Sequence, residues 1–242
     1  MKRSSEHFQK TLQVLQKAPL FHNISQAILE DMLECFKYKT LPSKSTIMPD
    51  DIADYFHIII SGRLEIIKIN ENSGRIVILN ILEAGDSFDI MQLLSSKPCD
   101  GIMQVLDDLE IISAPLKQVK AWILAHPEFN RNFLPYLGKQ MRLISELVGD
   151  LALHDTETRL ARLIVRHIDK NDPNNLQLKL INDLPHDILA EMIGSVRIVI
   201  NRQLQLWRKK EIISLDHGHI HIENLEKLLA LTDQHLLPSN SR

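Results

Sequence analysis

The spacing of hydrophobic positions changes along the chain, and each change predicts a different kind of structure. From residue 18 to 38, apolar side chains recur at helical spacing after Ser25, a residue type that caps helix N-termini. From residue 41 to 115, apolar residues form short runs of strand length that are separated by turn sequences rich in Gly, Asn, Ser and Asp. Such runs suit a small barrel or jelly roll, although a sheet with a purely structural role has the same pattern.

Helical spacing returns between residues 117 and 153. Apolar residues there alternate steps of three and four, as do the a and d positions of a coiled coil. These residues are Leu134, Leu137, Met141, Ile144, Val148 and Leu151. The seam covers only about two and a half heptads, so an amphipathic helix packed on its own domain has the same pattern. We expect a homodimer that pairs along this seam.

Residues 185 to 222 have the pattern of two helices joined by a tight turn and followed by a β-hairpin. Gly194 supplies the turn, and the second helix is expected from about residue 196 to 210. Apolar residues gather on one face of that helix, and cations and amides on the other. The predicted apolar face consists of Val196, Val199, Ile200, Leu204, Leu206 and Trp207. The hairpin would be the wing of a winged helix-turn-helix.

The charge of the second helix differs from that of the whole chain. It holds five cations and no acid between residues 196 and 210, whereas the formal net charge of the protein is -3. Affinity for DNA depends on where cations cluster and not on their sum. We expect Arg197, Asn201 and Arg202 to read bases, and Ser195 and Lys209 to contact phosphates. A solvated basic face on a core helix is the alternative.

Composition excludes several classes of protein. The hydrophobic fraction of 44% and the charged fraction of 24% are those of a soluble globular protein. No apolar run approaches the roughly 18 residues of a membrane span, and the polar N-terminus is no secretory signal, so we expect a cytoplasmic protein without a membrane partner. Cys35 and Cys99 are too few for an iron–sulfur cluster. No catalytic or metal-binding motif is present, so we expect neither an enzyme nor a metal site.

Four fragments, in this order, resemble the Crp/Fnr superfamily of bacterial transcription regulators. They are LFHNIS, YFHIIISGRLEIIKINENSGRIVILNILEAGDSF, LVGDLALHDTETRLARLIV and LAEMIGSVRIVINRQLQLWRKKEII. The resemblance implies an α+β fold with four parts: an effector-sensing β-roll of the cyclic-nucleotide-binding type with N-terminal helices (1–128), a dimerisation helix (129–155), a winged helix-turn-helix that binds DNA (156–232) and a tail (233–242). It also implies a homodimer that binds a palindromic promoter site and contacts RNA polymerase.

The effector-binding segment departs from the cyclic-AMP-binding branch of that family. Those members carry a Gly-Glu pair and then an Arg-Ser pair, which hold the ribose and the cyclic phosphate. In this chain Ile90 and Met91 stand where the first pair should be, and Gly101 and Ile102 where the second should be. Because the arginine is missing, a cyclic phosphate would lack its charged partner, so we do not expect cyclic AMP as the effector.

The same apolar segment resembles the branch that includes haem-dependent nitric-oxide sensors. Ile90, Met91 and Met103 are therefore candidates for a cofactor pocket, and haem is the cofactor that such a pocket suits. His22 and His57 lie in the right half of the chain to be ligands, and nothing in the sequence chooses between them. Simple sheet core is the other explanation for these apolar residues.

The reading helix also departs from the family at one position. Many members have a glutamate after the first arginine, whereas this chain has Ile198, which can contact a thymine methyl group. The operator is therefore expected to differ from the family consensus at that base pair. We predict a sequence-specific transcription regulator with an unidentified effector. The rival hypothesis is an effector- or haem-binding sensor module whose head does not read DNA specifically.

Overall fold

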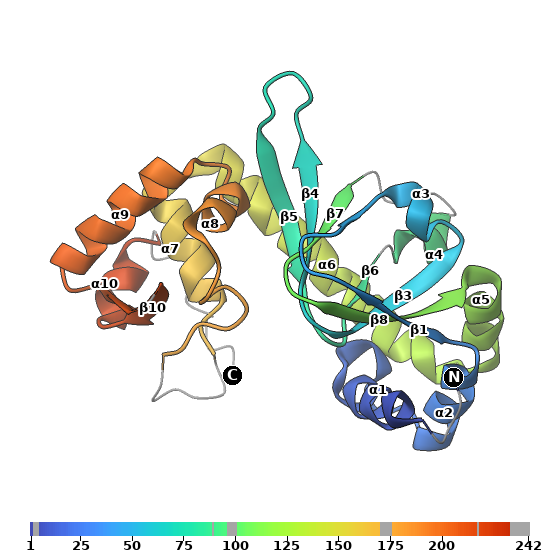
Figure 1. Ribbon diagram of the computed structural model, residues 1–242. Helices are drawn as coiled ribbons and strands as arrows, with labels where there is room; N and C mark the ends of the chain where they lie inside the picture. Colours follow the sequence, from blue (N-terminus) through green and yellow to red (C-terminus); the bar gives the residue numbers. More distant parts are fainter. Residues whose placement is uncertain (2–4, 89, 96–100, 170–175, 217, 233–242) are drawn as a thin grey trace. The chain divides into compact units, whose positions relative to one another are not determined.

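The computed structural model describes residues 1, 5–88, 90–95, 101–169, 176–216 and 218–232 (Figure 1). Cys99 and the tail (233–242) lie outside the described residues. The helices are α1 (Glu6–Lys17), η1 (Pro19–Phe21), α2 (Gln26–Glu34), α3 (Pro49–Ile52), α4 (Met91–Ser95), α5 (Leu116–Ala125), α6 (Glu128–Leu153), α7 (Thr156–Arg166), α8 (His186–Met192), α9 (Arg197–Lys209) and α10 (Leu225–Ala230). The strands are β1 (Lys37–Leu41), β2 (Thr46–Ile47), β3 (Tyr55–Ser61), β4 (Leu64–Ile69), β5 (Ile76–Leu82), β6 (Ser87–Phe88), β7 (Ile102–Val105), β8 (Leu109–Pro115), β9 (Ile213–Asp216) and β10 (His219–Ile222).

The chain forms two compact units. The first consists of Met1–Lys68 and Leu79–Ile144, and the second of Ile69–Ile78 and Ser145–Arg242. The division falls inside α6, so both units include part of the long helix. Within the described residues, none of the helices combines the length and the apolar character that crossing a membrane requires. The mixture of a two-sheet domain, helices and a C-terminal helix-turn-helix confirms the predicted α+β fold class.

Two four-stranded sheets build the roll. One has the strand order β1-β8-β3-β6 and the other β2-β7-β4-β5. Pairing is antiparallel between β3 and both of its neighbours, β8 and β6, and also between β4 and β7. Successive side chains of a strand point to opposite faces of the sheet. The sequences of β3 and β8 are nearly continuous apolar runs because both of these faces are covered.

Both faces of the first sheet are covered. Ile58 and Ile60 of β3 and Ile112 of β8 pack in a cluster with the helices α1, α2, α5 and α6. Ile59 of β3 and Ile111 of β8 pack on the other side, in a cluster that includes side chains of the second sheet. His57 has the same parity as Ile59 and therefore faces the inside of the roll.

Local signals fix the ends of several helices. The Ser25 hydroxyl accepts a hydrogen bond from the Ile28 backbone N–H at 3.4 Å, which confirms the predicted N-cap of α2. Asp155 does the same for α7, where its carboxylate accepts from the Thr158 N–H at 2.9 Å. These hydrogen bonds lower the pKa of Asp155, because they stabilise the charged form.

Candidate nucleic-acid interface

A tight turn joins α8 to α9. The Ser195 N–H donates back to the Ala190 carbonyl at 2.8 Å, and Gly194 has a φ of +60°. A Cβ atom at Gly194 would lie 2.7 Å from the Leu151 Cδ2 atom, closer than real Cβ contacts allow. Glycine is therefore favoured here by the left-handed backbone conformation, and a larger residue would also have to displace the end of the Leu151 side chain.

One stripe of α9 is buried in the second unit. Ile200, Leu204 and Trp207 are fully covered and follow one another at steps of four and three. The predicted apolar face was wrong at two positions, because Val196, the N-cap residue of α9, is 61% exposed and Leu206 is 41% exposed. The covered stripe is narrower than the apolar arc of the helical wheel, since α9 packs on its neighbours along one line only.

Two hydrogen bonds to one carboxylate hold α9 against α7. The Trp207 Nε1–H donates to the Glu157 Oε1 atom at 3.0 Å, and the Gln203 amide donates to the same oxygen at 2.8 Å. A charged acceptor strengthens both hydrogen bonds. Glu157 thus fixes the rotation of α9 about its own axis, which decides the side chains that face outward.

The outward face of α9 carries most of the residues predicted to bind DNA. Exposed side chains on α9 include Arg197, Ile198, Asn201, Arg202 and Lys209. Ser195 lies in the turn before the helix and is half-buried. Ile198 is 80% exposed, which is unusual for a large aliphatic side chain on a helix that also has a covered face. The structure therefore places the predicted residues on one helix and in the turn before it.

Asn201 is held by a partner that the sequence pattern did not indicate. The His186 Nδ1–H of α8 donates to the Asn201 Oδ1 atom at 2.5 Å. The bond orients the amide while leaving a second lone pair on the oxygen and both N–H donors on the nitrogen. Pairing with the edge of adenine needs one acceptor and one donor from this side chain, so the bond with His186 is compatible with that role.

The predicted hairpin follows α9 as β9 and β10. Ile220 pairs with Leu215 and His221 with Ser214, and Gly218 in the connecting turn has a φ of +90°. The Asn182 side chain accepts from the Ile220 N–H at 2.8 Å and ties the hairpin to the rest of the unit. A helix-turn-helix with a two-stranded wing is therefore present in the described residues.

The predicted dimer seam of α6 is only partly covered by this chain. Four of its apolar side chains are exposed to solvent, by 41% to 74%: Leu134, Met141, Ile144 and Val148. The other two are half-buried, because Leu137 packs against the helical core of the first unit and Leu151 lies beside Gly194. The exposed members leave an apolar face on α6 in this single chain.

A buried ion cluster joins the end of α6 to α7. Asp150 accepts from the Arg162 Nε–H at 2.5 Å and also pairs with Arg166, while the Asp150 side chain is only 3% exposed. Glu146 adds a longer contact of 3.5 Å to Arg166. Each charge of this cluster is compensated, so the bend between the two helices is held in one geometry.

The three candidates for a cofactor pocket do not come together. Ile90 is buried in the cluster on the helical side of the first sheet, whereas Met103 is fully buried between the two sheets. Met91 begins α4 and is 52% exposed. Their closeness in the sequence does not put them in one cavity, because β7 and the turn before α4 direct them to different surroundings.

Of the two candidate haem ligands, His57 does not fit that role in this structure. The Nε2–H of His57 donates to the Ile52 carbonyl at 3.3 Å, and the Ser113 hydroxyl donates to Nδ1 at 2.7 Å, so neither ring nitrogen is available to iron. Burial lowers the pKa of His57 to about 4, so the ring is neutral at pH 7. His22 is exposed, and among the described residues no group of three or more His, Cys, Asp or Glu side chains is placed to hold a metal ion.

Comparison with known families identifies two domains. Residues 41–126 match the cyclic nucleotide-binding domain, and residues 158–231 match the Crp-like helix-turn-helix domain. The second match includes both α8 and α9, as well as the wing.

Two curated relatives resemble the chain in sequence, and one solved structure resembles it in fold, over most of their length. The chain is 23% identical over 211 residues to a global nitrogen regulator of Synechocystis, covering 86% of this chain and 91% of the relative. It is 21% identical to a CRP-like cAMP-activated global transcriptional regulator of Mycobacterium tuberculosis, covering 89% and 97%. A CooA mutant from Carboxydothermus hydrogenoformans has a similar fold, with a TM-score of 0.71, 21% identity and coverage of 84% and 90%.

Proposed function

We propose, from the premise that the chain belongs to the Crp/Fnr family of DNA-binding transcription regulators, that it recognises a specific promoter sequence with the outward face of α9. The observation that carries the proposal is the separation of roles on this helix. Its apolar stripe is fully buried, while Arg197, Asn201 and Arg202 are exposed on a helix with no acid. A helix of this kind fits the major groove of B-DNA.

Each residue type has a defined role in this proposal. Arg197 and Arg202 donate paired hydrogen bonds to guanine O6 and N7, and Asn201 pairs with the edge of adenine. Ser195 and Lys209 contact phosphates at the two ends of the helix and position it in the groove. Ile198 contacts a thymine methyl group, so the operator has thymine where a glutamate would select cytosine.

The exposed apolar face of α6 supports a homodimer. In a parallel helix pair related by two-fold symmetry, Met141, Ile144 and Val148 of one copy would pack on the same residues of the other. A symmetric dimer presents two reading helices and binds a palindromic site whose half-sites lie about one helical turn apart. Such a dimer bound at a promoter acts through contact with RNA polymerase.

The effector that we propose is not a cyclic nucleotide. Support comes from Gly101 and Ile102, which stand where a cyclic phosphate would need an arginine. Two cysteines in the whole chain also argue against an iron–sulfur effector. Haem stays a prediction from sequence alone, and the absorption spectrum of protein purified with haem supplied decides it, since bound haem gives a Soret band.

Selection of bound fragments from genomic DNA, followed by sequencing, tests the proposal. We expect enrichment of one palindromic motif, bound at least about 10³-fold more tightly than random DNA at moderate salt. Affinity for random DNA should fall steeply with salt, because it comes from phosphate contacts alone. Equal binding of all fragments, with no motif, would contradict the proposal and favour a sensor module whose head no longer reads DNA.

A further inference from the structure

The roll contains a cavity that is separate from the candidate residues Ile90, Met91 and Met103. It has a volume of about 400 Å³, which lies in the range of small-molecule sites, and it opens between β1, β2, α3, β3 and β8. The turn before α4 and the strand β7, which carry the three candidates, contribute no residue to its lining. The two regions can therefore be distinguished by experiment.

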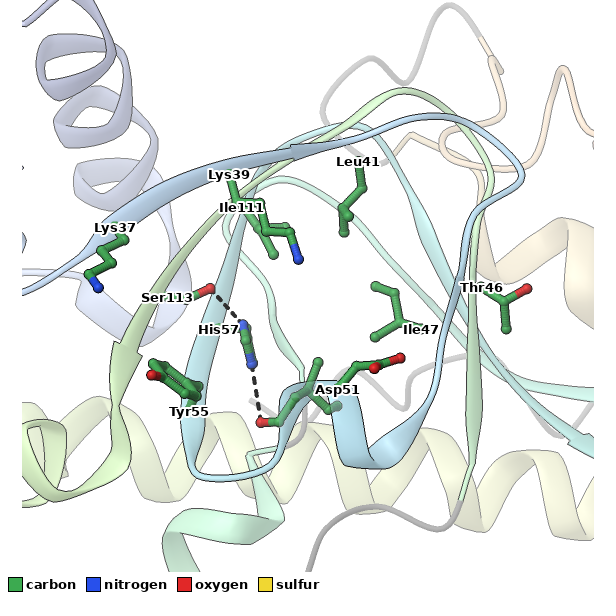
Figure 2. Close-up of a pocket in the computed structure, with 11 residues that line it drawn as sticks. Lys37, Lys39, Leu41, Thr46, Ile47, Asp51, Tyr55, His57, Ile111 and Ser113 are labelled. Atoms are coloured by element: carbon green, nitrogen blue, oxygen red, sulfur yellow. Dashed lines mark hydrogen bonds between the residues drawn. The ribbon is translucent and has the colours of Figure 1, made fainter.

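Four aliphatic side chains form one part of the cavity wall. Leu41, Ile47 and Ile111 border it from β1, β2 and β8 (Figure 2), and Ile52 of α3 also lines it. Three of these four side chains belong to the buried cluster between the sheets, and Leu41 packs against it. A ligand that enters the cavity would thus extend the apolar core with its own apolar body.

Two lysines, Lys37 and Lys39, line the cavity, and both are partly open to solvent. Figure 2 shows the Lys39 side chain extending from β1 into the space bordered by Leu41, Ile47 and His57, while Lys37 lies at the edge of the view. The charge of Lys39 acts on the His57 ring, where it helps to keep the ring neutral. Within the part of the chain that the structure describes, Lys39 makes no ion pair.

His57 forms a rigid wall and not a binding group. Its two nitrogens are taken by Ser113 and Ile52, and its ring stacks on Phe88 of β6 at a centroid distance of 4.6 Å and an angle of 8°. Asp51 is the acid of the lining, and its carboxylate accepts from the Met48 N–H at 3.0 Å. A ligand with two negative charges would meet Asp51 with only lysine charge to offset the repulsion, and so a single negative charge suits the site best.

We infer that this cavity binds a small monocarboxylic acid, with its carboxylate on the Lys39 ammonium and its apolar body between Leu41, Ile47 and Ile111. The inference does not rest on DNA binding by α9, because the site is complete within the first unit. Lys39 is chosen over Lys37 because Figure 2 shows its side chain between Leu41, Ile111 and His57, whereas Lys37 lies at the edge of the view.

The cavity is connected to α6 by short contacts. Phe88, which stacks on His57, follows Ser87 in β6, and the Ser87 N–H donates to the Tyr136 hydroxyl at 3.2 Å. Tyr136 lies on α6 and is buried. A ligand placed against His57 is therefore separated from the long helix by only β6.

Titration of the full-length protein with octanoate tests the inference, with isoleucine methyl groups observed by NMR. We expect shifts at Ile47, Ile52 and Ile111, and none at Ile90. Octan-1-ol, which has the same body without the charge, should bind more weakly than octanoate. Shifts confined to Ile90, or no saturable shift at all, would overturn the inference.

Two variants and a control make the assignment specific. Lys39→Met should weaken octanoate binding about tenfold, as the loss of one charge-assisted contact does, and leave octan-1-ol binding unchanged. Leu41→Trp should fill the cavity and remove the binding of both probes, with folding checked by circular dichroism. Lys117→Met changes an exposed lysine of α5 outside the cavity and should change neither affinity. Octanoate binding that is equal in wild type and Lys39→Met would overturn the assignment, whether or not the Trp variant folds.

Discussion

Helices α6 and α9 follow the same helical repeat but present opposite chemistry to the solvent. One exposed stripe of α6 is apolar, with Met141 74% and Val148 60% exposed, whereas the exposed face of α9 that is predicted to bind DNA carries arginine, lysine and asparagine. An exposed apolar face is covered most favourably by another apolar face, and a cationic one by phosphates. The type of residue on the exposed face, and not amphipathicity itself, therefore indicates the partner of each helix.

Both helices are fixed by charged contacts to α7. Asp150 of α6 pairs with Arg162 and Arg166 of α7, and Glu157 of α7 accepts from Trp207 and Gln203 of α9. The apolar and cationic faces are thus anchored on one short helix. Variants on each side of α7 show whether the two faces depend on these anchors.

The largest expected effect is on the buried stripe of α9. Trp207→Ala removes a fully covered ring and should lower the free energy of unfolding of the second unit by about 3 to 5 kcal/mol. Leu206→Ala, at the half-exposed neighbouring position, should cost less than about 1 kcal/mol. Urea denaturation followed by circular dichroism measures both, and similar losses would contradict the assigned faces.

The anchor of α6 comes next. Asp150→Ala leaves two arginines without their buried partner and should lower the free energy of unfolding of the second unit by about 3 kcal/mol. This value is at the lower end of the range for a broken buried ion pair, because both arginines are partly exposed. Glu146→Gln removes only the longer, more exposed contact to Arg166 and should cost under about 1 kcal/mol. An equal effect in thermal unfolding would show that burial of Asp150 contributes nothing.

The oligomeric state of the protein tests the role of the apolar face of α6. Met141→Glu places like charges on facing helices and should raise the dissociation constant of the dimer about a hundredfold, or about 3 kcal/mol at most. Arg142→Glu changes an exposed neighbour outside the predicted seam and serves as the control. Sedimentation equilibrium distinguishes the two, and an unchanged dimer in Met141→Glu would exclude pairing through this face.

A smaller effect is expected at Ile198, the highly exposed aliphatic residue of α9. Ile198→Glu should shift the preferred base pair from thymine towards cytosine, with a change in discrimination of about 1 to 2 kcal/mol. Gln205→Glu adds the same charge two turns later and should weaken binding without changing the preference. Sequencing of DNA selected by each variant gives the preference, and identical motifs for wild type and Ile198→Glu would refute the methyl contact.

The sequence predicted features within one helix or turn better than it predicted contacts between elements. The N-cap at Ser25, the turn at Gly194 and the buried positions Ile200, Leu204 and Trp207 all follow from local spacing, and the structure confirms them. The contacts that orient α9 do not, because Glu157 and His186 come from separate helices and no spacing relates them to α9.

In the roll, too, the sequence predicted the strands but not how separate elements come together. Short apolar runs predicted strands of a small barrel or jelly roll, and in the structure β3 and β8 are strands covered on both faces. The cavity beside Lys39 was not predicted, since it depends on how α3 closes one edge between the two sheets. Ile90 and Met91 were predicted to share one pocket because they are neighbours in the sequence, but Ile90 is buried in the core and Met91 is 52% exposed.

The most direct test of DNA reading by α9 is the affinity of the double variant Arg197→Ala, Asn201→Ala for the selected operator and for an unrelated duplex. Fluorescence anisotropy should show a loss of at least about a hundredfold on the operator, because two base contacts are removed, and less than about tenfold on the unrelated duplex. The free energy of unfolding should fall by no more than about 1 kcal/mol, since both side chains are exposed and only the hydrogen bond between His186 and Asn201 is lost. Undiminished affinity of the folded double variant for the operator would contradict the account.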